Sequence, residues 1–174
     1  MLKFMDLAFK FLLMVLCVTG LLFETSKSER IFSILPPPES RDVVKETLAD
    51  LKAPSERLPF LSKWITSASG VTRLDPILLC CLLQTESRFK KDAVSEKGYR
   101  GEAQTKRFSQ YSSVNILEGA ETLRDKLSLS NGDMLEAIAR YKGGKDNVEA
   151  RQQARQVLAL YQSQLERRGL WSPE

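Results

Sequence analysis

Apolar residues recur at helical spacing along the part of the chain that follows residue 40. Residues three or four positions apart lie on one face of an α-helix, and this period is the main sequence signal of an amphipathic helix. It predicts two helices first, and Gly70 is expected to end the second. Their predicted inner faces are Val43, Val44, Thr47, Leu48 and Leu51, then Leu58, Leu61, Trp64, Ile65 and Ala68.

The third predicted helix is apolar over most of its length, from Pro76 to Leu83. Asp75 is expected as its N-cap and Pro76 as its first residue, since both residue types favour these positions. Glu86 then falls in the last turn, on the face that carries Leu79, Leu82 and Leu83. The sequence therefore predicts a carboxyl group at the C-terminal end of an apolar helix.

A polar segment with two glycines follows, from Lys90 to Ser113, and it has no regular period. We predict a long ordered loop with one short helix near residues 103–107, and loops of this length tend to be functional. Helical periodicity returns at 114–127, 134–141 and 148–165, separated by the turn sequences SNGD and KGGKD. No strand is predicted. The fold class is therefore all-α, with a single globular domain at residues 39–174 behind an N-terminal hydrophobic segment.

The first 23 residues contain Lys3 and Lys10 ahead of an apolar stretch that ends at Phe23. This pattern is typical of a secretory signal peptide or of a short membrane anchor over residues 7–23, and a buried first helix is the remaining alternative. Residues 24–38 include three consecutive prolines, which favour an extended tether. Whether the segment is a signal peptide or an anchor, we expect the domain that follows to be exported to the periplasm or to another extracytoplasmic location.

The amino-acid composition excludes several classes of enzyme and of metal site. The chain has 174 residues, of which 43% are hydrophobic and 28% charged, and it has no histidine. The missing imidazole excludes Ser-His-Asp hydrolases, Cys-His peptidases and the common zinc hydrolases. Three cysteines, two of them the neighbours Cys80 and Cys81, match neither a disulfide framework nor a metal site. We interpret this pair as core residues and predict neither metal nor cofactor.

The formal net charge of +4 suits an anionic partner, but does not choose among membrane, nucleic acid and cell wall. A nucleic-acid ligand is disfavoured because the basic residues are scattered and no basic stripe rich in aromatic residues occurs.

Glu86 is the candidate for chemistry. Apolar surroundings and the negative end of a helix dipole both disfavour ionisation, so its pKa is predicted to be raised. A carboxylic acid that keeps its proton near neutral pH is suited to protonate the leaving oxygen of a glycosidic bond. The alternative is a helix end in solvent, with Glu86 paired to Arg88 or Lys90.

Four short segments occur in one order: TESRF, AVSEKGYRGEAQ, NILEGAETL and AIARYKGG. Together they resemble the catalytic domain of lytic transglycosylases and goose-type lysozymes, over about Leu74 to Gly144. The resemblance implies a lysozyme-like fold, peptidoglycan glycan strands as substrate, and cleavage between N-acetylmuramic acid and N-acetylglucosamine with formation of a 1,6-anhydro end. Alternatives are a muramidase that hydrolyses the same bond and a non-catalytic wall-binding or assembly protein.

The resemblance also assigns residues. Glu86 matches the catalytic acid, and Ser87 the serine that follows it. Gln104 matches a glutamine that lines the sugar cleft, Tyr141 a tyrosine whose hydroxyl approaches the acid, and Asn115 the asparagine that opens the helix behind the cleft. Gly98 and Gly101 match glycines that let the loop turn closely against the substrate.

Two residues depart from the family pattern, because Glu102 and Lys142 stand where an apolar residue and an asparagine are usual. Both would bring charge to the cleft. No second catalytic acid is predicted, because Asp92, Glu96 and Glu102 are each interpreted as solvated loop charges. The resemblance implies a domain held at the cytoplasmic membrane, and it leaves open whether such an enzyme serves general wall turnover or a secretion or conjugation apparatus.

Overall fold

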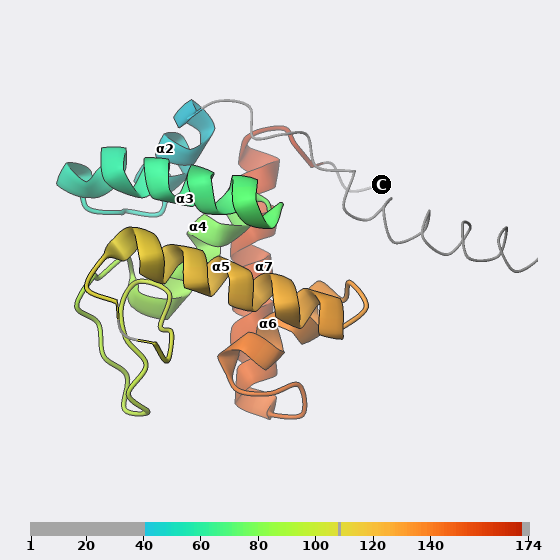
Figure 1. Ribbon diagram of the computed structural model, residues 1–174. Coiled ribbons are helices and arrows are strands. Elements are labelled where there is room, and N and C mark those ends of the chain that lie inside the picture. Colours follow the sequence, from blue (N-terminus) through green and yellow to red (C-terminus); the bar gives the residue numbers. More distant parts are fainter. Residues whose placement is uncertain (1–40, 108, 172–174) are drawn as a thin grey trace, which may run out of the picture. The chain divides into compact units, whose positions relative to one another are not determined.

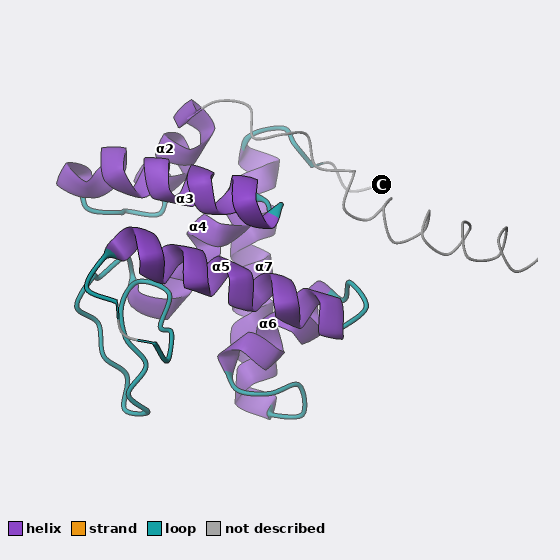
Figure 2. Ribbon diagram, in the orientation of Figure 1, coloured by secondary structure: helices purple, strands orange, loops and turns teal. Residues whose placement is uncertain are grey.

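The computed structural model describes residues 41–107 and 109–171, and these form one mostly helical domain (Figure 2). In these two ranges there are six α-helices, one 3-10 helix and no strand, so the all-α prediction is confirmed for this part of the chain. The predicted signal or anchor, the tether and the first two residues of the predicted domain lie outside it. No single described helix is long and apolar enough to span a membrane; only Ser55–Thr72 and Pro76–Ser87 taken together would be, and they meet at a bend of 119°.

The helices follow the predicted order (Figure 1). Their bounds are α2 Arg41–Asp50, η1 Ser55–Arg57, α3 Leu58–Thr72, α4 Pro76–Ser87, α5 Ser112–Leu129, α6 Met134–Lys142 and α7 Val148–Arg167. The prediction that Gly70 ends its helix is wrong. Gly70 is exposed, and α3 continues to Thr72, where Arg73 takes a left-handed conformation and its N–H bonds Ser69 O.

Helix α4 is the core helix of the domain. Asp75 caps it as predicted, because its carboxylate accepts a hydrogen bond from Ile77 N at 2.7 Å, and Pro76 is its first residue. Every residue from Ile77 to Leu83 is at most 3% exposed, including Cys80 and Cys81, so the prediction that the two cysteines are core residues is confirmed. A helix that is apolar on all sides is stable only when other elements cover it, and α2, α3 and α7 pack against α4.

The remaining helices pack in sequence, α3 on α5, α5 on α6 and α6 on α7. In Figure 1 α3 and α5 lie side by side in front of the long α7. Asp133 and Asn147 cap α6 and α7 through their side chains, as their residue types favour. Helix α7 is tied back to the start of α4, since the Tyr161 hydroxyl donates to Asp75 Oδ2 at 2.5 Å.

The long loop between α4 and α5 extends to one side of the helices (Figure 1). The short helix predicted near residues 103–107 is wrong. The loop instead folds back on itself, so that Arg100 and Thr105 bond each other's backbone, with both N···O distances 3.0 Å. Phe89, at the start of the loop, is fully buried and anchors it to the core. Residues 100–105, which we call the loop turn, are thereby presented to α4, α5 and α6.

Candidate active site

Glu86 lies in the last turn of α4, as the sequence predicted, and its side chain is only 12% exposed. Burial raises the pKa of its carboxyl above the ordinary glutamate value, while the neighbouring Lys142 ammonium acts in the opposite direction. Desolvation is the larger effect. The carboxyl group therefore keeps its proton to a higher pH than a free glutamate does.

The partner of Glu86 is Lys142, the last residue of α6. Its Nζ lies 2.7 Å from Glu86 Oε1, and the lysine side chain is only 6% exposed. Lys142 also donates to Thr85 Oγ1 at 3.1 Å. The alternative in which Glu86 ends the helix in solvent beside Arg88 or Lys90 is therefore wrong. The charge predicted at Lys142 instead contacts the candidate acid directly.

Tyr141 precedes Lys142 and reaches the same region. Its hydroxyl donates to Ala103 O of the loop turn at 2.6 Å. Burial and the negative charge of Glu86 both raise the pKa of Tyr141 well above its ordinary value. The phenol therefore stays neutral, and it lies close enough to Glu86 to interact with it electrostatically.

Asn115 is buried in the first turns of α5 and holds the loop turn by three hydrogen bonds. Its Oδ1 accepts from Ala103 N at 2.8 Å, and its Nδ2 donates to Arg100 O at 3.0 Å and to Thr105 Oγ1 at 2.8 Å. An amide can donate and accept at once, so one side chain holds both sides of the turn in place. At 1% exposure, Asn115 positions the turn and offers little surface to a ligand.

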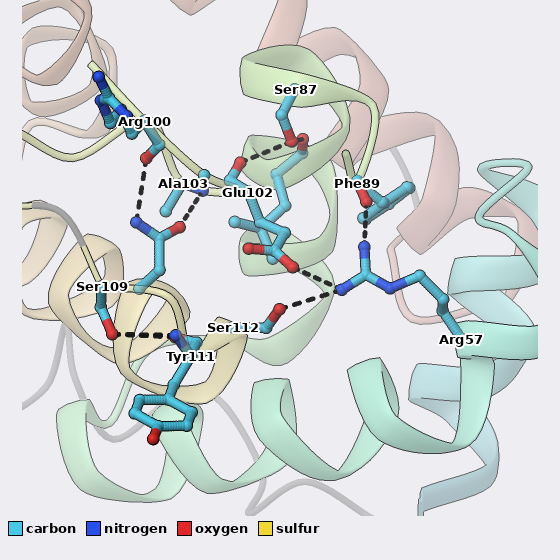
Figure 3. A network of polar contacts seen from close by, with 12 residues as sticks. Arg57, Ser87, Phe89, Arg100, Glu102, Ala103, Ser109, Tyr111 and Ser112 are labelled. Carbon is cyan, nitrogen blue, oxygen red and sulfur yellow. Dashed lines mark hydrogen bonds and ion pairs between the residues drawn. The ribbon is translucent and has the colours of Figure 1, made fainter. Parts of the chain in front are cut away.

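Ser87 follows the candidate acid and holds the same turn from the α4 side. Its hydroxyl donates to Glu102 O at 2.8 Å, as Figure 3 shows. Ser87, Asn115 and Tyr141 come from three helices, and each bonds the backbone of residues 100–105. The structure thus brings these three predicted site residues together around one turn, and Ser87 directly follows Glu86 in the chain.

Two glycines make this close approach possible. A Cβ at Gly101 would lie 2.5 Å from Asn115 Oδ1, and Gly101 has a φ of +81°. A Cβ at Gly119 in α5 would lie 2.4 Å from Ala103 Cβ and 3.0 Å from the Tyr141 hydroxyl. Only a residue without a side chain fits either position. Gly98 also has a positive φ, but open space surrounds it.

Gln104 is half-buried in the loop turn, and its amide faces the loop itself. Its Nε2 donates to Gly101 O at 2.9 Å and to Ala93 O at 3.2 Å. The side chain thus braces the loop.

The interpretation of Glu102 as a solvated charge is wrong, because Glu102 is 1% exposed and forms an ion pair with Arg57. The distance from Arg57 Nη2 to Glu102 Oε1 is 2.5 Å, and the same guanidinium donates to Phe89 O and to Ser112 Oγ (Figure 3). A buried carboxylate needs such a partner. Asp92 and Glu96 are exposed, as predicted.

Sequence reasoning missed two positioning residues, Arg57 and Gly119. The signal for a partner like Arg57 was Glu102 itself, since an acid in an otherwise tightly packed turn needs a cation. Gly119 had no signal beyond its place in a helix, where glycine is unfavourable without a packing reason.

Within residues 41–107 and 109–171 no group of three or more Cys, Asp or Glu side chains is placed to hold a metal ion. Comparisons with protein-family models, with curated proteins and with solved structures found no match.

Proposed function

We propose that this domain is a lysozyme-like peptidoglycan lytic transglycosylase in which Glu86 acts first as the acid and then as the base. The observation that carries the proposal is the setting of Glu86, whose side chain is 12% exposed at the end of the core helix, with a raised pKa. A general acid must hold its proton at the working pH and still reach the leaving oxygen. The raised pKa of this buried carboxyl at a helix end favours the first requirement.

The arrangement of the other matched residues supports the proposal independently. Ser87, Asn115 and Tyr141 were assigned from separate motifs, far apart in the chain. An accidental likeness gives no reason for their side chains to meet, yet all three bond the loop turn. This convergence favours a site that was built around that turn.

The proposed reaction needs one carboxyl group and no water. The Glu86 carboxylic acid gives its proton to the glycosidic oxygen as the bond from that oxygen to C1 of N-acetylmuramic acid breaks. The N-acetyl carbonyl of the same sugar stabilises the cationic C1. The 6-hydroxyl of that sugar then attacks C1, and the Glu86 carboxylate takes its proton. The sugar ends as a 1,6-anhydro ring, and Glu86 is an acid again.

The test is incubation of the full-length protein with purified peptidoglycan, followed by mass spectrometry of the released fragments. We expect 1,6-anhydromuramoyl ends from the wild type, and a loss of about 10²-fold or more in Glu86→Gln, which is the usual contribution of a general acid. Fragments heavier by one water molecule would indicate the muramidase instead. No release by the wild type would contradict both enzymes.

The second candidate is a non-catalytic wall-binding or assembly protein with the same fold. One observation favours it, because the Lys142 ammonium lies 2.7 Å from Glu86 Oε1 and stabilises the ionised carboxylate. Binding of the protein to sedimented peptidoglycan without release of fragments, unchanged in Glu86→Gln, is the result that this candidate predicts.

The N-terminal residues support a further proposal about where in the cell the domain acts. We infer export across the cytoplasmic membrane, with residues 7–23 as signal or anchor and with glycan strands rather than nucleic acid as the partner. A wall-cutting domain must reach its substrate outside the cytoplasm, whether it serves turnover or a secretion or conjugation apparatus. Protease accessibility of the domain in intact spheroplasts tests this.

A further inference from the structure

The net positive charge of this protein comes from the loop between α4 and α5. Residues 88–107 hold seven of the 26 Lys and Arg residues and three of the 22 Asp and Glu residues, so the rest of the chain has 19 of each and no net charge. The basic residues are scattered along the chain, but their excess over the acids is not. The formal charge of +4 is therefore a property of one segment.

The basic side chains of this loop are open to solvent. All seven basic residues are exposed, whereas Glu102 is buried in its pair with Arg57 and leaves Asp92 and Glu96 as the exposed acids of the loop. Six of the basic side chains form no ion pair with another described residue, and we call them the basic loop surface: Arg88, Lys90, Lys91, Lys97, Lys106 and Arg107.

The fold of the loop keeps these charges together. Two antiparallel bridges, Val94 with Arg100 and Arg100 with Thr105, place its segments side by side, and the loop extends to one side of the helices (Figure 1). Buried Phe89 and the bonds from Asn115 attach it to the core. A surface that is ordered before binding loses less conformational freedom when a ligand arrives. Closely spaced charges of one sign also raise the local concentration of an anionic ligand.

The basic loop surface begins next to the candidate acid. Arg88 lies two residues after Glu86, and Ser87 between them bonds Glu102 O of the loop turn. Tyr141, which interacts electrostatically with Glu86, bonds Ala103 O of the same turn. A polymer bound at Glu86 is therefore within reach of the basic loop surface.

We propose that the basic loop surface binds the peptide stems of the glycan strand through their carboxylates. The inference rests on the proposed function. In that polymer the carboxyl group of muramic acid is amide-bonded to the stem, so the negative charges lie on the stem peptides. A stem leaves the strand at the sugar whose bond Glu86 would cleave, beside the loop. Ammonium and guanidinium groups bind carboxylates through charge-assisted hydrogen bonds. The surface thereby favours strands that carry stems over uncharged glycan.

The experiment is sedimentation of the full-length protein, in mild detergent and on ice, with insoluble peptidoglycan freed of other anionic polymers. One portion of the peptidoglycan is native. In the other, carbodiimide and excess ammonium convert the stem carboxylates to amides, which removes the negative charge and keeps both glycan and stems. Binding to the two portions is compared over a range of salt concentrations.

Two triple variants with the same loss of charge separate the loop from the protein as a whole. Each replaces three exposed lysines by glutamine, so neither disturbs a buried contact. The loop variant changes Lys90, Lys91 and Lys97. The control variant changes Lys45, Lys63 and Lys145, which lie outside the loop.

We expect the wild type and the control variant to prefer native over amidated peptidoglycan at low salt. The loop variant should bind the native form about fivefold more weakly than the wild type does, the combined effect of three exposed ion pairs. Its binding to the amidated form should be unchanged. The preference should weaken as salt is added, because exposed charges are screened.

Equal binding of the wild type to both forms, or an equal loss in the two variants, would overturn the proposal. If the wild type binds both forms equally and only the loop variant loses retention on beads with covalently attached phosphatidylglycerol, the surface faces a membrane instead. Release of anhydro fragments by the wild type separates this failure from that of the proposed function. Fragments without a charge preference leave the enzyme standing, whereas a loop-dependent preference without fragments contradicts the enzyme and supports stem binding.

Discussion

The ammonium nitrogen of Lys142 lies 2.7 Å from Glu86 Oε1, with both side chains largely buried at the meeting of α4 and α6. Burial pushes Glu86 toward its protonated form and Lys142 pulls it toward the ionised one, and burial is the larger effect. Glu86 lies in the last turn of α4, where the helix dipole also favours a nearby cation. The Lys142 ammonium therefore opposes protonation of Glu86 in the free protein. The predictions below concern this balance and the contacts that hold the loop turn.

The first prediction concerns the coupling of this pair. We expect Glu86→Gln and Lys142→Met each to change the free energy of unfolding, and the double variant to reveal an interaction energy of about 0.5–3 kcal/mol. Urea unfolding of the four proteins measures it. The control is the pair of Arg140 and Glu136, which are 28% and 30% exposed and should couple by only about 0.3–0.5 kcal/mol. Equal coupling in the two pairs would contradict the buried ion pair.

The second prediction concerns the contact between α5 and the loop turn. Gly119→Ala would place a Cβ 2.4 Å from Ala103 Cβ and 3.0 Å from the Tyr141 hydroxyl. We expect a loss of about 1–3 kcal/mol of stability from overpacking, together with a changed Tyr141 environment in the near-ultraviolet circular dichroism spectrum.

Gly70→Ala is the matched control, because Gly70 is also helical and a Cβ there meets nothing within 4 Å. Alanine at an open helical position should stabilise the protein by about 0.4–1 kcal/mol. A neutral Gly119→Ala would show that the loop turn is not packed against α5 in this way.

The third prediction concerns the buried ion pair of the loop. Arg57→Met leaves the Glu102 carboxylate, 1% exposed, without its cation. Breaking a buried pair in this way costs about 3–5 kcal/mol, measurable by thermal or urea unfolding. Arg124→Met is the control, since Arg124 and Asp125 are 43% and 67% exposed and their pair should contribute about 0–1 kcal/mol. A similar small loss in both variants would contradict the role of Arg57.

The helices were predictable because their apolar spacing is local information. The spacing located α2 to α7, and residue types alone identified the cap Asp75 and the first residue Pro76. The end of α3 was not predictable from Gly70, because a glycine in open space permits a helix to end but does not require it. The actual end at Arg73 depends on a left-handed residue with no distinctive side chain.

The site was predictable where a residue's role depended on its own helix, and not where it depended on another element. Glu86 at the end of an apolar helix could be read from the sequence. Its pairing with Lys142 could not, because Lys142 belongs to another helix, α6, and the contact forms only in the folded domain. Glu102 is the same case, since its partner Arg57 is 45 residues away in the sequence and its burial follows from that contact.

The fourth prediction follows from the sign of the Glu86 shift. Because its pKa is raised in the folded protein, the folded state binds the proton more tightly than the unfolded chain does. The resulting stability is complete below the unfolded pKa of about 4.3 and is lost as the pH rises through the folded pKa. The unfolding free energy of the wild type relative to Glu86→Gln should therefore fall from acid toward neutral pH. A difference that grows with pH would mean that Lys142, and not burial, dominates.

The most direct test of the account is an NMR titration of the Glu86 side-chain carboxyl carbon in full-length wild type and in Lys142→Met, assigned by comparison with Glu86→Gln. We expect a wild-type pKa above the ordinary value of about 4.3, and a higher one when the ammonium is removed. A wild-type pKa at or below the ordinary value would contradict the claim that burial outweighs Lys142 and raises the pKa of Glu86.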